Sequence, residues 1–470
     1  MTSLTPSARS LPDTFPAFSN GDVEIVLTPA QKLKLHADVL RGGSSKLSEL
    51  LAIEHAAILN KKALSEGTSV RHRLELVDVT PTPGGNVGRL AVIKIGANGR
   101  PISERGAPRA SMTLSSHGVD PASRAILSAW LSVFGALYGN EIHLYSHASS
   151  SMPAPIPDDD LDVNMDDYEL GRTTAITAGA DLCDIISAAS TILDVVDYLE
   201  LRSSVLAPLE LALLGAEQTL WQSVCAAPLS WIEVGARLRS LPIWREAALH
   251  VVGGWATGEW SEQEKGELPA EVRELCARKS ARFEAYKERL EERLLTYKHE
   301  KLRWDERKDK CKPKKQHEPD VFHWQAQTLW SQWLAARFSE GEGRRARDGG
   351  FALYKKIWEG AFCDPVEQAK IAPLVPGGRR RVGKIMDDMK ADLKKMVDSI
   401  MISKLRLDQS KMQANRLTPF TIEIRNAPWK NKDADYEASD HDNKRVLLEE
   451  EQKLIPAEEE DEFEDFISYP

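Results

Sequence analysis

The order of apolar and polar positions predicts a chain that begins with strands and then becomes helical. Apolar and polar residues alternate over residues 22–27, as in a half-buried strand that ends at Thr28-Pro29. Residues 33–40 begin as a second strand and pass into a helix, and β-forming residues gather again over 70–79 and 89–95. We therefore expect a small mixed sheet near the N-terminus.

Apolar residues recur at helical spacing through most of the remaining chain. The predicted helices cover 46–62, 121–139, 168–201, 205–224, 229–238, 244–255, 269–308, 322–338 and 379–411. In the helix over 269–308, apolar residues repeat every seven positions, at Cys276, Phe283, Leu290 and Tyr297. Charged residues stand between them, so a single solvated helix is favoured over a coiled coil. The spacing of Trp324, Trp330 and Trp333 predicts the packed side of a helix.

Charge is distributed unevenly along the 470 residues. With 42% hydrophobic residues the chain can form domains with real cores, and its net charge of -10 argues against a surface that binds nucleic acid all over. Residues 301–400 carry a net charge of +7, whereas residues 401–470 carry -7. Ten carboxylates and one lysine fall between Glu449 and Asp465, so residues 421–470 are predicted to form a mostly disordered acidic tail.

Cysteine usage and the absence of targeting segments indicate the cytoplasm or the nucleus. The five cysteines are odd in number and form no C-x-x-C pair, as expected for reduced thiols. Residues 1–19, which we expect to be disordered, lack the apolar segment of a signal peptide, so secretion is not expected. The most apolar run, Ala178–Leu201, contains five acidic residues, which makes a membrane span unfavourable.

Three motifs in the first half of the chain resemble the BTB/POZ domain, and the sequence of the strand-rich middle and of the Trp-containing helices that follow is most similar to divergent BTB proteins of fungi. The three motifs are Gly21–Leu27, Leu35–Leu40 with serines behind it, and Ala129–Ile142. The positions that fit the family, in structural or interface roles, are Asp22, His36, Val39, Leu40, Ser44, Trp130, Phe134, Leu137, Tyr138 and Gly139.

The resemblance implies an α+β fold with an N-terminal BTB/POZ-like mixed sheet and helices, an all-helical extension and the disordered acidic tail. The BTB-like domain would cover 20–200 with loop insertions at about 80–120 and 150–167, followed by the helical extension at 201–260 and a charged helical region at 261–420. The implied function is a non-enzymatic adaptor with protein partners, either self-associating as a homodimer or recruiting targets to a cullin-type ubiquitin ligase. No cofactor and no membrane contact are expected.

Two other functions stay open on the sequence. The basic clusters Lys308–Lys315 and Arg379–Arg381 fit a nuclear, chromatin- or transcription-associated factor whose 301–400 block contacts nucleic acid. An enzyme would need a site in 261–420, where no catalytic motif occurs. Cys311, His317 and His323 match no zinc spacing, so no metal is expected, and His36 is interpreted as a buried structural histidine.

Overall fold

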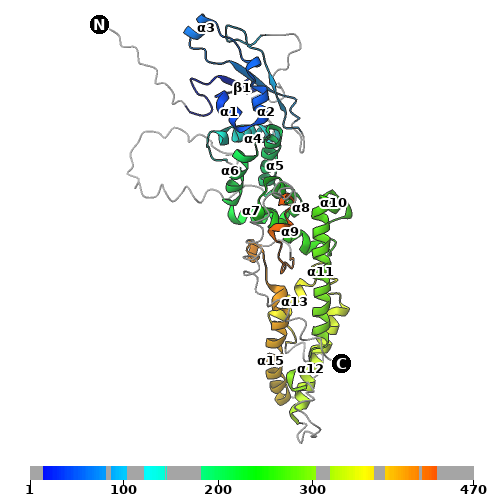
Figure 1. The fold of residues 1–470 in the computed structure, drawn as a ribbon. Helices are drawn as coiled ribbons and strands as arrows, with labels where there is room; N and C mark the ends of the chain where they lie inside the picture. The colour runs from blue at the N-terminus through cyan, green and yellow to red at the C-terminus, as the bar shows by residue number, and fades with distance from the viewer. Residues whose placement is uncertain are drawn as a thin grey trace, which may run out of the picture.

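The computed structural model describes residues 14–80, 86–102, 121–142, 144, 182–302, 318–364, 376–411 and 415–430. The molecule is elongated, with a sheet at one end, helices α12 and α15 at the other, and the long helix α11 running between them (Figure 1). None of the helices in the described ranges is both long and apolar enough to cross a membrane.

The N-terminal sheet has four strands in the order β2-β1-β3-β4. Strand β1 (Val23–Thr28) pairs antiparallel with β2 (Gln31–Leu35) and parallel with β3 (His72–Val77), which pairs antiparallel with β4 (Arg89–Val92). The predicted α+β class and mixed sheet are therefore confirmed. Of the predicted insertions, residues 86–102 are described and include β4, whereas 81–85, 103–120 and 145–181 lie outside the described residues.

The segment between β2 and β3 is broken into short helices. It contains α1 (Ala37–Gly43), α2 (Ser45–Leu50), the 3-10 turn η1 (Ile53–His55) and α3 (Lys61–Ser65), so the single helix predicted over 46–62 is wrong. Ser44 begins α2 by accepting a hydrogen bond from the Leu47 backbone N–H at 2.9 Å. Beyond α2, the Ala57 N–H donates to the Arg71 carbonyl at 2.8 Å. This long-range bond holds residue 57 beside the approach to β3, so the helix cannot continue.

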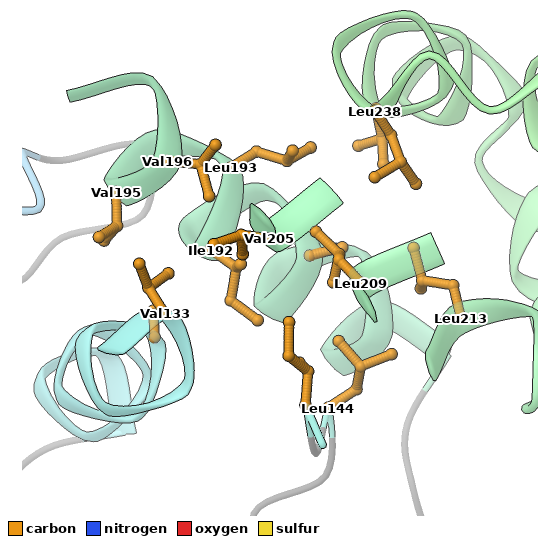
Figure 2. Close-up of a cluster of buried hydrophobic side chains, with 14 of the residues drawn as sticks. Val133, Leu144, Ile192, Leu193, Val195, Val196, Val205, Leu209, Leu213 and Leu238 are labelled. Carbon is orange, nitrogen blue, oxygen red and sulfur yellow. The ribbon is translucent and has the colours of Figure 1, made fainter. Parts of the chain in front are cut away.

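One hydrophobic core joins the sheet to the helices that follow it. These are α4 (Pro121–Leu137), α5 (Leu182–Leu199), α6 (Arg202–Leu214), α7 (Glu217–Ala226), α8 (Pro228–Leu238) and α9 (Leu241–Gly254). Figure 2 shows part of this core, where Val133 of α4 faces Ile192 of α5 and Leu209 of α6 lies nearby. The helix predicted over 205–224 is two helices, because the chain turns at Gly215-Ala216. The predicted extension at 201–260 thus shares its core with the sheet.

Helix α11 (Ala270–Leu295) belongs to two cores. Cys276 packs in the first core, whereas Phe283 and Leu290 pack in a second core with η4 (Glu300–Leu302), α12 (Glu318–Ser339), α13 (Phe351–Trp358) and α15 (Pro376–Met401). The short helix α10 (Glu262–Glu267) precedes α11. The seven-residue repeat is therefore buried within the same chain, and the interpretation of a solvated helix is wrong for that face.

After α15 the chain turns back toward the first core, as residues 402–411 and 415–430, which we call the C-terminal strap. It contains η5 (Gln409–Lys411) and η6 (Ile424–Asn426). Leu417 lies in the second core, whereas Ile422 and Ala427 are buried in the first. Residues 421–430, assigned to the disordered tail by composition, are thus packed in the fold.

Arg416 anchors the strap to the helices of the first core. Its guanidinium forms a two-point ion pair with Glu259, donates to the Cys225 carbonyl at 3.1 Å and contacts His250 Nδ1 at 3.1 Å. It also lies over the Trp260 ring, 5.4 Å from the centroid. Because a buried guanidinium is stable only with most of its donors satisfied, the strap has a single well-defined position here.

A second anchor is the buried carboxylate of Glu246 on α9. It accepts backbone hydrogen bonds from Arg406 N at 2.9 Å and Leu407 N at 3.0 Å. Burial raises the pKa of Glu246, and the two N–H donors act in the opposite direction. Close approach of the strap also depends on Gly253, where a Cβ atom would lie 2.9 Å from the Leu417 carbonyl oxygen.

Replacing Arg416 with Met should lower the free energy of unfolding by about 2 kcal/mol. The loss leaves Glu259 and the Cys225 carbonyl without their donor, and the partial exposure of Glu259 reduces the penalty below that of a fully buried pair. Urea titration followed by tryptophan fluorescence measures the change. The matched control is Arg425→Met, because that side chain is 77% exposed in its pair with Glu423. Equal effects of the two substitutions would contradict the anchoring role.

Acidification should destabilise the fold through His250. Burial and Arg416 lower the pKa of His250 from 6.5 to about 3, so the unfolded chain takes up a proton that the folded chain refuses. Stability is therefore retained above pH 6.5 and lost below it, by roughly 1 kcal/mol per pH unit from this group. His250→Asn, which keeps an acceptor for Arg416, should flatten the dependence measured by urea titration between pH 7.5 and 5.5. An unchanged slope in this variant would exclude His250 as the source.

Candidate protein-interaction site

The predicted signature positions gather where β2 passes into α1. The Asp22 carboxylate accepts from the Ala37 N–H at 2.7 Å, and the His36 N–H donates to the Tyr138 hydroxyl at 2.8 Å. Ser44 caps α2 and donates to the Leu199 carbonyl. Burial raises the pKa of Tyr138. These contacts tie the sheet to the end of α4. His36 has the expected hydrogen-bond partners, with its ring Nε2 2.9 Å from Asn20 Oδ1, but it is half-buried and not buried as predicted.

The other signature positions divide between core and surface. Trp130, Phe134 and Leu40 are buried, and Trp130 Nε1 donates to the Val87 carbonyl at 2.9 Å. Leu137 is half-buried, whereas Val39 and Gly139 are exposed. Most of these residues therefore hold the fold together. An interface role for the exposed ones stays a prediction.

Helix α12 presents two different faces. Its buried face carries Trp330 and Trp333, which pack against Phe362 with ring centroids 5.0 and 5.2 Å away. Trp330 also donates its indole N–H to the Leu294 carbonyl at 3.2 Å. The predicted burial is confirmed for these two tryptophans. It is wrong for Trp324, which is 56% exposed on the other face.

An apolar groove follows the exposed face of α12. Its volume is about 280 Å³, and Val321, Trp324, Gln325, Thr328 and Leu329 line it. Leu329 forms a buried floor, while Val321 is 51% exposed. The Gln325 amide oxygen is buried without a donor from any described residue. An unpaired buried acceptor is costly, so a ligand that supplies an N–H would be favoured at this position.

Positive charge lies beside the groove. Arg381 at the start of α15 stacks over Phe322, with 5.2 Å between the guanidinium carbon and the ring centroid. Arg379 and Arg380 precede it, are exposed, and have no ion pair within the described ranges. The predicted cluster Arg379–Arg381 thus neighbours an apolar surface. The cluster Lys308–Lys315 lies outside the described residues.

Buried polar groups join α12 to the segment between α11 and η4. Gln327 donates to the Tyr297 carbonyl at 2.6 Å and accepts from the His299 N–H at 3.0 Å. The ring centroids of His299 and His323 are 5.0 Å apart. Burial lowers the pKa of His299, and the neighbouring His323 lowers it further. Across the described ranges, no group of three His, Cys, Asp or Glu side chains could hold a metal ion. Cys311 and His317 lie outside those ranges.

Residues 299–399 match the family model of the FF domain. The match is to the fungal type of this domain and covers η4, α12, α13 and nearly all of α15. FF domains are protein-interaction modules that often occur in transcription or splicing factors. No curated protein and no solved structure matches the chain. We call residues 299–399 the FF-like module.

The BTB/POZ interpretation is wrong, because the chain matches the FF domain and no BTB/POZ domain among the known protein families. Local physics accounts for the motifs that suggested it. Gly139 has a φ of +79° just after α4, which glycine adopts without strain, and Trp130 fills the core under the sheet. Any sheet packed on a helix can need such residues. The homodimer and the cullin-type scaffold rested on that resemblance and lose their support with it.

Proposed function

We propose that this chain is a non-enzymatic interaction protein of nuclear transcription or RNA-processing assemblies, and that its FF-like module binds a segment of a partner protein in the α12 groove. The observation that carries the proposal is the exposed Trp324 over an apolar groove inside a segment that matches a protein-interaction family. Tryptophan is enriched among the few interface residues that contribute most of the binding energy.

The surroundings of the groove favour a particular ligand chemistry. Val321, Trp324 and Leu329 offer an apolar seat, and Arg379–Arg381 offers unpaired positive charge beside it. A segment that places an apolar side chain next to carboxylates would satisfy both. Such a ligand buries its apolar group, and its carboxylates pair with guanidinium groups.

Contact of this module with nucleic acid is the second candidate, favoured by the net charge of +7 over 301–400. In the described part of the module, however, Trp330 and Trp333 are buried and cannot stack on bases. Trp324 sits over an apolar groove, which suits a side chain better than a phosphate backbone. The protein partner is therefore the better-supported function.

Trp324→Ala should weaken binding of peptides selected from an arrayed library against the full-length chain by about 30-fold, since a hot-spot tryptophan contributes about 2 kcal/mol. Fluorescence anisotropy measures the dissociation constants. Leu211→Ala is the matched control, because Leu211 is a 73% exposed apolar residue on α6, and its loss should change nothing. Both substitutions should leave the free energy of unfolding within about 0.5 kcal/mol of the wild-type value.

Two results would overturn this proposal. One is selected peptides that bind the Trp324→Ala chain and the wild-type chain equally. The other is binding of random-sequence DNA that weakens steeply between 50 and 200 mM salt and depends on Arg379–Arg381, together with no peptide binding. That pattern is the signature of phosphate contacts.

A further inference from the structure

Four arginines form a stripe along α11, outside the FF-like module. Arg278, Arg282, Arg289 and Arg293 are separated by four, seven and four residues, so they lie within about 60° of one another around the helix. All four are exposed. None has an ion pair with another residue in the described ranges. We call these residues the arginine stripe.

The strap places an ion pair, Arg425 with Glu423, at the N-terminal end of the stripe. Arg425 and Arg278 line the same pocket of about 190 Å³, together with the carboxylate of Glu271. Lys279 donates to the Thr421 carbonyl at 3.1 Å. Burial lowers the pKa of Lys279. The nearby carboxylate of Glu423 raises this pKa, whereas the neighbouring arginines, Arg425 among them, lower it. Cations outnumber carboxylates at this junction.

The chain carries its compensating charge immediately beyond the strap. Residues 431–470 contain fifteen Asp and Glu against four Lys and Arg, so the first 430 residues have a net charge of only +1. Residues 420–428 of the strap run antiparallel to α11 and end at the pocket beside Arg278, so the segment that follows must turn back to run along the stripe. Residues 433–442 hold five carboxylates. At about 3.3 Å per extended residue they can reach along the stripe, which spans about 22 Å.

We propose that the acidic segment 431–470 lies on the arginine stripe of its own chain. A segment joined through a short connection has an effective concentration in the millimolar range, which favours it over anions from outside. Multiple exposed charge pairs, each weak alone, then hold it there. The stripe is thus an anion-binding surface that its own chain occupies. This proposal is independent of the α12 groove.

Carbodiimide cross-linking of the full-length Arg282→Lys chain tests the contact, because this conservative change places an amine on the stripe. Mass spectrometry should find amide links between residue 282 and carboxylates of 431–470. Their yield should exceed that of links from Lys395, which is 79% exposed on α15, by several-fold. It should fall several-fold at 1 M salt, where the Debye length is about 3 Å. The links should also be lost when Arg278→Glu and Arg289→Glu are added.

The outcomes separate the proposal from its competitors. Equal yields at residue 282 and Lys395, or yields that the added charge reversals do not change, would overturn it. A mixture of isotopically light and heavy chains should give links within one chain only, and mixed links would instead assign the contact to a second copy. Links from lysines of α15 in place of residue 282 would place the segment on the FF-like module and reject the stripe.

A binding measurement provides a second readout. Neutralising the five carboxylates of 433–442 to Asn and Gln should tighten binding of a fluorescent single-stranded DNA probe to the full-length chain several-fold. The gain should disappear in the Arg278→Glu, Arg289→Glu background. Affinity for the probe that depends on the stripe but is unchanged by neutralisation would show that the segment leaves the stripe uncovered, and the proposal would be wrong.

Discussion

The buried guanidinium of Arg416 is the constraint on which the arrangement of the two cores depends. It holds the strap against α7, α9 and Glu259. The described part of the chain therefore returns from the second core and ends in the first. Arg416 is 8% exposed, so an alternative strap position would bury an unpaired charge or lose the ion pair. Together with α11, which contributes to both cores, the strap gives the FF-like module a second connection to the N-terminal body.

This double connection affects how the module can be presented to a partner. The groove on α12 faces away from the buried side that packs on α11 and Phe362, and Trp324 lies on the free side of the helix. Because α11 and the strap are fixed at both cores, a ligand in the groove meets a preformed helix face. Preorganisation of this kind lowers the entropic cost of binding.

The sequence predicts the sheet and most helices because their signals are local. Alternation in β1 and the apolar stripe of α4 need no tertiary information. The helix over 46–62 fails because the Ala57 hydrogen bond to Arg71 joins residues that only the fold brings together. Composition places residues 421–430 in the acidic tail, yet the ring of Trp429 packs edge-on against that of Trp244, with 5.8 Å between their centroids. The strap's anchors are single long-range partners, which no periodicity reveals.

The candidate site shows the same limit, with one exception. A helical wheel places Trp324 about 120° from Trp330, so the spacing itself predicts that Trp324 lies on another face, and grouping the three tryptophans on one packed face overlooks this angle. The arginine stripe follows equally from the intervals between its residues, whereas the net charge of α11 as a whole averages these arginines with the glutamates of the same helix. The charge on one face of a helix, and not the net charge of a segment, determines which ligand that surface can bind. A nearly neutral body can therefore carry a concentrated cationic surface, and an acidic segment that continues from the strap begins where that surface begins.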